Sequence, residues 1–310
     1  TCGLVIFSFM NQIFTGILTA MGNSRTSFIA TGIGLVLNIV LDPLFIFGFG
    51  VIHPMGVAGA AIATVLAQLV VMLLFLYTIL RDTVLFCDVH ILHSYSSQHT
   101  REIFRIGLPS AVQSMLFSGI SMVIARLIAG WGDAAVAVQK VGSQIESISW
   151  MTAEGYAAAL NSFVAQNHGA KNTDRIREGY RLSMIVMLSW GVFCSFVLIV
   201  FPQLIFQVFI QEAEVLPMGV DYLRILGVSQ LFMCMEITTA GAFSGLGKTL
   251  PPSIVSITLT GARIPMAILL GRWLGLNGVW WAITISSIGK GIVLLGWFLK
   301  DMKRAGMPER

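Results

Sequence analysis

The sequence predicts an all-α integral membrane protein that crosses the bilayer many times. Of its 310 residues, 56% are hydrophobic and only 11% are charged, against about 25% charged residues in soluble domains. The mean hydropathy is +0.83. The apolar residues also gather in long uninterrupted runs. A chain with this composition and this patterning has its surface in lipid.

The same composition excludes several other classes. A chain this apolar is not intrinsically disordered, and its net charge of +4 is too small to indicate a polyanion partner, so we expect the lipid bilayer as partner and no nucleic acid. Four scattered cysteines without a CxxC pattern exclude a disulfide scaffold.

A membrane-spanning helix needs roughly 20 mostly apolar residues. Short turns rich in Gly, Asn, Ser and Pro, such as Gly22-Asn23-Ser24 and Pro251-Pro252, separate such stretches along the chain. The runs are too long for the strands of an outer-membrane barrel and lack their period-2 alternation. We therefore predict nine spanning helices. In order, they cover residues 1–22, 27–49, 56–80, 103–130, 140–167, 180–208, 222–245, 251–272 and 277–299.

The basic residues of the loops predict the orientation, because cytoplasmic loops carry the excess of Lys and Arg. With nine crossings, one side of the membrane receives thirteen basic residues, and the other receives only Arg224 and Arg272. We therefore expect the C-terminus in the cytoplasm. The thirteen are Arg25, Arg81, Arg101, Arg105, Lys171, Arg175, Arg177, Arg181, Lys248, Lys300, Lys303, Arg304 and Arg310.

An internal repeat relates the two ends of the chain. The segment 19–26 resembles 244–249 at an offset of 225 residues, and Gly56–Ala60 resembles Gly278–Ala282 at an offset of 222. A deletion of three residues in the second copy would reconcile the two offsets. The first three predicted helices therefore correspond to the last three.

The three middle helices, 103–208, have no counterpart upstream. We expect a parent protein of twelve helices in two six-helix lobes, of which this chain lacks the first three helices. The predicted organisation is 1–80, the remainder of the N-terminal lobe; 81–102, a cytoplasmic linker; 103–299, the C-terminal lobe; and 300–310, a cytoplasmic tail.

The polar junctions resemble those of the MATE (multidrug and toxic compound extrusion) family. Gly155–Ala159 running into Gln166–Asn172 is similar to the junction after the second helix of a lobe, as is Gly22–Thr26 followed by Asn38–Gly48. The resemblance extends over essentially the whole chain, as helices 4 to 12 of twelve.

That resemblance implies a transporter of the prokaryotic plasma (inner) membrane. It would export organic, often cationic, small molecules by alternating access, in exchange for H⁺ or Na⁺ and without a cofactor. Coupling residues that the family carries in its first helix are not assignable here.

Ionisable residues inside an apolar span usually face a cavity or a partner. Counted from 140 and 222, Glu154 and Glu236 each lie 14 residues into their helices, about 21 Å at 1.5 Å per residue. Arg263 lies at a similar height, whereas Glu146, only about 9 Å from its helix end, is expected to be shallow. The full set of ionisable residues in the spans is Asp42, Arg126, Lys140, Glu146, Glu154, Glu236, Arg263 and Lys290.

We interpret Glu154 and Glu236 as a midplane acidic site for the coupling ion, tuned by Arg263. Burial and a nearby cation act in opposite directions on the pKa of a carboxyl group, and together they can poise it for proton exchange. The hard oxygens of a carboxylate also suit Na⁺. The repeat places Asn11 and Asn38 at the positions of Glu236 and Arg263. Two alternatives stay open: a structural ion pair between Glu236 and Arg263, or separate partners for each.

Other polar and soft residues are weaker candidates. Asp42, before Pro43, either caps or kinks its helix or lines the ion pathway. Asn11, Asn38, Tyr156 and Met235 are candidates for a substrate cleft. For Tyr156 and Met235 the reason is that soft, adaptable surfaces suit promiscuous binding. Further aromatic and methionine candidates are Phe117, Met122 and Trp150.

Several functions are disfavoured. The turn Gly245–Thr249 resembles the end of a P-loop, but the pattern requires glycine at Ala242, so we expect no ATP binding. Cys87, His90 and His93 have only loose metal-ligand spacing, and we expect no metal site. A lipid-linked sugar flippase would favour a cationic cavity, a membrane-embedded enzyme would need clustered His or Asp, and a passive channel would need a ring of filter residues.

Overall fold

The computed structural model describes residues 5–48, 53–81, 97–210, 212 and 214–304. The chain divides into two compact units, Thr1–Tyr95 and Ser96–Arg310, and each is described by itself. Most of the predicted linker 81–102, including Cys87, His90 and His93, and the end of the predicted tail 300–310 lie outside the described residues.

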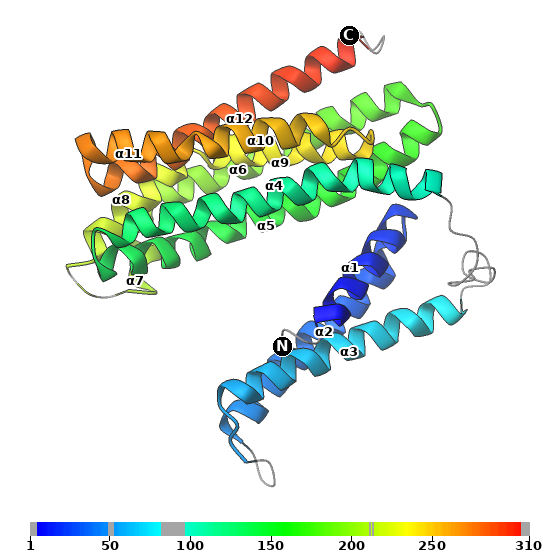
Figure 1. Cartoon of the computed structure of the whole chain (residues 1–310), viewed down its shortest axis with the longest axis horizontal. Coiled ribbons are helices and arrows are strands. Elements are labelled where there is room, and N and C mark those ends of the chain that lie inside the picture. Colours follow the sequence, from blue (N-terminus) through cyan, green and yellow to red (C-terminus); the bar gives the residue numbers. More distant parts are fainter. Residues whose placement is uncertain (1–4, 49–52, 82–96, 211, 213, 305–310) are drawn as a thin grey trace. The chain divides into compact units, whose positions relative to one another are not determined.

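In its described residues, the first unit has three helices, α1 (Val5–Ala20), α2 (Ser24–Phe47) and α3 (Val57–Arg81) (Figure 1). The α2 helix starts where Asn23 accepts hydrogen bonds from the Thr26 amide at 3.3 Å and from its hydroxyl at 2.9 Å, which is a typical N-terminal cap. A small core of Leu18, Ala30, Val71 and Phe75 holds the three helices together.

The second unit is an all-helical bundle (Figure 1). One of its apolar segments is bent, because α8 and α9 meet at an angle of 46°. The helices α10 and α11 are separated only by Ala262, whose backbone is helical, and together form one span of 25 residues. Its helices are α4 (Ser97–Ala129), α5 (Asp133–Gly169), α6 (Thr173–Val200), α7 (Pro202–Gln207), α8 (Leu216–Gly227), α9 (Gln230–Gly245), α10 (Leu250–Gly261), α11 (Arg263–Leu274) and α12 (Leu276–Arg304).

Every predicted span coincides with a helix or a pair of consecutive helices in the described residues. By length and apolar composition, six helices of the described residues could cross a membrane, with α10 and α11 counted as one, or seven if the bent pair α8–α9 is one span. The α1 helix has only 16 described residues. The α5 helix is long, but it carries the polar residues Lys140, Glu146 and Glu154, which lower its hydropathy.

The structure supports the first offset of the repeat. Adding 225 to the ends of α1 gives the ends of α9, Gln230 and Gly245. The glycines that follow, Gly22 and Gly247, both have positive φ angles, 82° and 69°.

The second offset of the repeat requires a correction. The turns into α3 and α12 contain Gly56 and Gly275, with φ angles of 54° and 61°. Three residues later, a Cβ on Gly59 or on Gly278 would collide with the carbonyl of the preceding helix, at Phe45 or Leu270. These pairs match at an offset of 219, so the second copy lacks six residues and not three. The predicted offset of 222 pairs Gly56, which has a positive φ angle, with Gly278, which is a helical glycine packed against Leu270.

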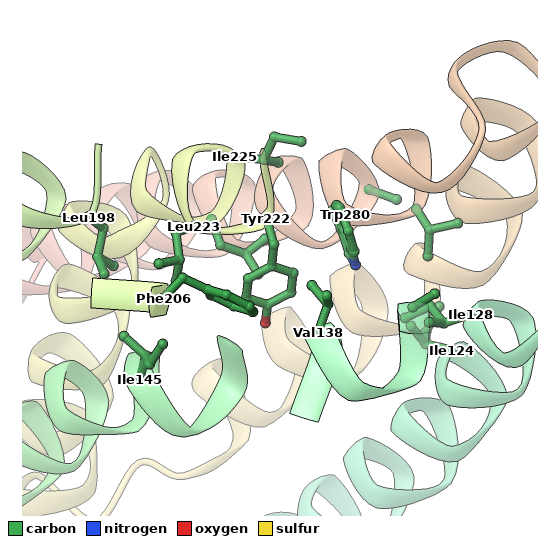
Figure 2. Close-up of a cluster of buried hydrophobic side chains, with 14 of the residues drawn as sticks. Ile124, Ile128, Val138, Ile145, Leu198, Phe206, Tyr222, Leu223, Ile225 and Trp280 are labelled. Carbon is green, nitrogen blue, oxygen red and sulfur yellow. The ribbon is translucent and has the colours of Figure 1, made fainter. Parts of the chain in front are cut away.

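The largest buried cluster of the second unit joins α8 to α5 and α12. Figure 2 shows Tyr222 between Phe206 and Trp280, with its hydroxyl directed away from α8. The Tyr222 and Trp280 rings meet edge to face, with centroids 5.1 Å apart, and both side chains are at most 1% exposed. Such aromatic contacts fix the position of Tyr222 and of its polar end.

We expect Gly278→Ala to destabilise the protein by about 1–3 kcal/mol, because the added methyl group overlaps the backbone carbonyl of Leu270 and forces α12 away from α11. The matched control is Gly296→Ala on the same helix, where a Cβ meets nothing within 4 Å. Thermal unfolding of the two variants in detergent measures the effect. Equal melting temperatures would contradict this account of the turn.

Candidate functional site

A cavity of about 710 Å³ lies inside the second unit, lined by side chains from α4, α5 and every helix from α8 to α12. The lining from α4 and α10 is uncharged. The charged lining residues come from α5, α9, α11 and α12, and they are Glu146, Glu154, Glu236, Arg263 and Lys290. Five charged groups thus share one space inside helices that are otherwise apolar.

Glu236 forms an ion pair with Lys290 of α12, with 2.9 Å between Oε2 and Nζ. The two side chains are only 12% and 7% exposed. This corrects the predicted alternative of a Glu236–Arg263 pair.

Arg263 instead contacts α12. It donates hydrogen bonds to the hydroxyls of Ser286, at 2.5 Å, and Ser287, at 3.0 Å. Within the described residues it has no carboxylate at salt-bridge distance. Its charge nevertheless acts on Glu236 and Glu146 through space.

Glu154 lines the same cavity as Glu236, from α5. Its side chain is exposed and has no ion partner among the described residues. Counted from the ends of the segments at Asp133 and Leu216, Glu154 and Glu236 lie 21 and 20 residues in. The predicted pair therefore shares one cavity, but each carboxylate has different surroundings.

The surroundings of Glu146 were not predicted from the sequence. The α5 helix begins at Asp133, seven residues before the predicted start, so Glu146 lies about 20 Å from that end. Its carboxylate meets the Tyr222 hydroxyl and the Gln230 side chain. Its Oε1 is buried and has no hydrogen-bond partner within the described residues. The turn Trp131-Gly132 before Asp133 was the available sequence signal for the true helix start.

Two hydrogen bonds connect the aromatic core to the Tyr222 hydroxyl, which contacts this carboxylate. Trp280 donates to the Gln139 side chain at 3.0 Å, and Gln139 donates to the Tyr222 hydroxyl at 3.4 Å. Tyr222 in turn contacts Glu146. Tight packing of the rings thereby orients a polar group at the cavity wall.

Three predicted residues belong to the first unit and are bonded there. Asn11 donates to the backbone oxygen and to Oε1 of Gln68, at 2.9 Å and 2.8 Å. Asn38 donates to Asp42 at 3.3 Å. The α2 helix continues past Pro43 to Phe47.

Tyr156 and Met235, proposed for a substrate cleft, do not line the described cavity. Met235 is 7% exposed and packs in the core with Leu294 and Phe298. Tyr156 packs against a separate buried cluster around Ala153, Met187 and Cys234. Among the other aromatic candidates, Phe117 and Trp150 do line the cavity.

We expect Tyr222→Phe to lower stability by about 1–2 kcal/mol, because it leaves the buried partners Gln139 and Glu146 without the hydroxyl. Tyr156→Phe is the matched control, since no hydrogen bond to its hydroxyl is present in the described part of the chain. The comparison is again thermal unfolding in detergent. The proposed role of the hydroxyl fails if both variants melt alike.

Comparison with known proteins gives one consistent family. The MatE family model matches residues 109–269, just over half of the chain. A probable multidrug resistance protein NorM of Thermotoga maritima is 32% identical over 98% of this chain and 66% of its own length. The probable multidrug resistance protein YpnP of Bacillus subtilis is 27% identical over 91% of this chain and 62% of its own length.

Solved structures agree. A crystal structure of MATE in the straight conformation has a TM-score of 0.87 at 26% identity, covering 96% of this chain and 67% of the other. An outward-facing multidrug resistance MATE family transporter has a TM-score of 0.87 at 25% identity, covering 99% and 69%.

The chain spans about 60–66% of the length of the first curated relatives that it matches. The names of these relatives describe transport or drug resistance and no enzymatic activity. The apolar helices and the family agree on a multi-pass membrane protein. Because the family model matches more than half of the chain and the similarity to a relative extends over nearly all of it, the protein belongs to the MatE (MATE) family of transporters.

Proposed function

We propose that the protein is a secondary active transporter that exports organic small molecules in exchange for H⁺ or Na⁺ by alternating access. The observation that carries the proposal is the cavity of the second unit, where three carboxylates lie among apolar helices. Ionisable groups at such a depth are expensive to keep and mark ion or substrate pathways. Family membership and relatives named as multidrug resistance or export proteins support the same reading.

The carboxylates differ in their partners, and that difference suits exchange. Lys290 neutralises Glu236, while Glu146 and Glu154 have no ion partner within the described residues. An acid without a fixed counter-ion can take up a proton or bind Na⁺ through its hard oxygens. A cationic substrate and the coupling ion compete for the same carboxylate. Because only one of them binds at a time, the movement of one is coupled to the movement of the other.

The cavity favours cationic or neutral substrates. Three acidic groups face two basic ones, and Phe117 and Trp150 offer aromatic surfaces to an organic cation. A lipid-linked sugar flippase, the second candidate, would need an excess of positive charge for pyrophosphate. One relative is named as an FAD transporter, so related proteins are named for chemically different cargoes.

We also propose that the protein lies in the plasma (inner) membrane of a prokaryote, with its C-terminus in the cytoplasm. The asymmetry of Lys and Arg between the two sets of loops supports this orientation. An ion gradient is the proposed energy source. The glycine-rich turn Gly245–Thr249 joins α9 to α10, and its Lys248 forms an ion pair with Asp301 at 2.6 Å.

The direct test is ethidium efflux from vesicles that contain the protein, under separately imposed H⁺ and Na⁺ gradients. We expect efflux to follow one of the two gradients and to be independent of ATP. Efflux that ignores both gradients would refute antiport.

We expect Glu154→Gln, Glu236→Gln and Glu146→Gln each to reduce gradient-driven efflux by about tenfold or more, because each removes a charge that the cavity presents to the ion. Glu178→Gln is the control, since Glu178 is exposed on α6 and does not line the cavity. The role of the carboxylates is contradicted if the variants keep the pH and Na⁺ dependence of the unmodified protein.

A further inference from the structure

The ion pair between Glu236 and Lys290 is an expensive way to join two helices. Both side chains are largely withdrawn from solvent, at 12% and 7% exposure. Removing such charges from water is energetically costly for each ion, and uncharged residues of similar size often pack as well or better. Packing of α9 against α12 therefore does not by itself explain why this ion pair is present.

The first unit shows that the equivalent helix contact works without charge. Asn11 occupies the position of Glu236 in the repeat, and it joins α1 to α3 through the neutral amide of Gln68. The helices α3 and α12 correspond at the offset of 219, so Lys290 stands at the position of Val71, one turn beyond that of Gln68. Packing in this architecture does not require an acid and a base, and only the unit with the described cavity has them.

The surroundings make the pair exchangeable. Arg263 of α11 repels the Lys290 ammonium and attracts Glu236. The two remaining carboxylates of the cavity, Glu146 and Glu154, come from α5, and Tyr222 is the ionisable lining group from α8. The α4 and α10 helices contribute only uncharged lining. An ammonium released from Glu236 would thus face two acids that have no ion partner among the described residues.

We propose that Lys290 is a tethered cation that competes with the transported cation for Glu236. In the structure the Lys290 ammonium is paired with the Glu236 carboxylate. A monovalent or organic cation that enters the cavity displaces it, and when that cation leaves, the ammonium returns. This inference rests on the proposed function, because it concerns the same cavity. It adds the residue that keeps Glu236 compensated when no external cation is bound.

The test measures cation binding without any gradient. Purified protein in detergent is titrated with tetraphenylphosphonium, and separately with Na⁺, at several pH values. Lys290→Gln removes the competitor, so we expect both cations to bind at least about fivefold more tightly, since the apparent affinity in the unmodified protein is reduced by the fraction of Glu236 that the ammonium occupies. Lys290→Arg retains a tethered cation and should bind close to the unmodified protein. Lys248→Gln, which breaks the exposed pair with Asp301, should change nothing.

Two further variants keep the test decisive if Lys290→Gln alone does not fold. Glu236→Gln should weaken cation binding at least about fivefold, because the acid is lost and the ammonium remains. The double variant Glu236→Gln with Lys290→Gln replaces the ion pair by two amides, as at Asn11 and Gln68. It should melt near the unmodified protein and show no gain in affinity.

The proposal is overturned if Lys290→Gln folds and binds both cations no more tightly than the unmodified protein. It is also overturned if Glu236→Gln retains the original affinity. Gradient-driven efflux by the unmodified protein tests the proposed function separately. If Lys290→Gln gains affinity but the unmodified protein shows no antiport, the proposed function is rejected and the competition between Lys290 and the cation is supported. If the unmodified protein shows antiport but Lys290→Gln gains no affinity, the competition is rejected and the proposed function is supported.

Discussion

The cost of holding charge away from water is the constraint on which the second unit depends. Its helices are apolar enough to lie in lipid, yet five charged side chains line one internal cavity. Each must find compensation, because an uncompensated charge in such surroundings is strongly destabilising. Glu236 finds it in Lys290, Arg263 in two serine hydroxyls, and Glu146 in a tyrosine and a glutamine. Glu146 and Glu154 are left without an ion partner among the described residues.

A helix bend lies near the charge on α9. In the second unit, the bend of 46° between α8 and α9 comes directly before Gln230, six residues before Glu236. The segment α10–α11, which carries Arg263, forms one span of 25 residues with Ala262 in helical conformation. In the first unit, α2 runs without interruption from Ser24 to Phe47 and carries Asn38 where Arg263 stands. Broken helices free backbone polar groups and are tolerated at membrane depth where they face protein or a cavity. The two repeats thus share a packing plan, and the charged residues that line the described cavity belong to the second unit.

Much of the architecture could be predicted from the sequence. The lengths of the apolar runs locate the helices because the bilayer thickness sets a minimum span, and the prediction of an all-α membrane protein of the MATE family is confirmed. The first repeat offset also follows from sequence, because both copies have a glycine in the turn, Gly22 and Gly247, and both glycines have positive φ angles. The second offset was wrong, because glycines recur every three residues there and only the backbone geometry shows which pairs are equivalent. The surroundings of Glu146 could not be predicted, because they depend on contacts with Tyr222 of α8 and Gln230 of α9.

The sequence by itself determined that the chain is helical and membrane-embedded, and which ionisable residues lie inside its spans. It did so because hydrophobic run length and residue type are local properties. Only the tertiary structure decided that Lys290, and not Arg263, meets Glu236, and that Met235 lies in the core while Trp150 faces the cavity. Those outcomes depend on how each helix is rotated and bent against its neighbours, and contacts between distant segments set that rotation. A change of one residue in helical position turns a side chain by about 100°, which is enough to exchange a cavity wall for a core.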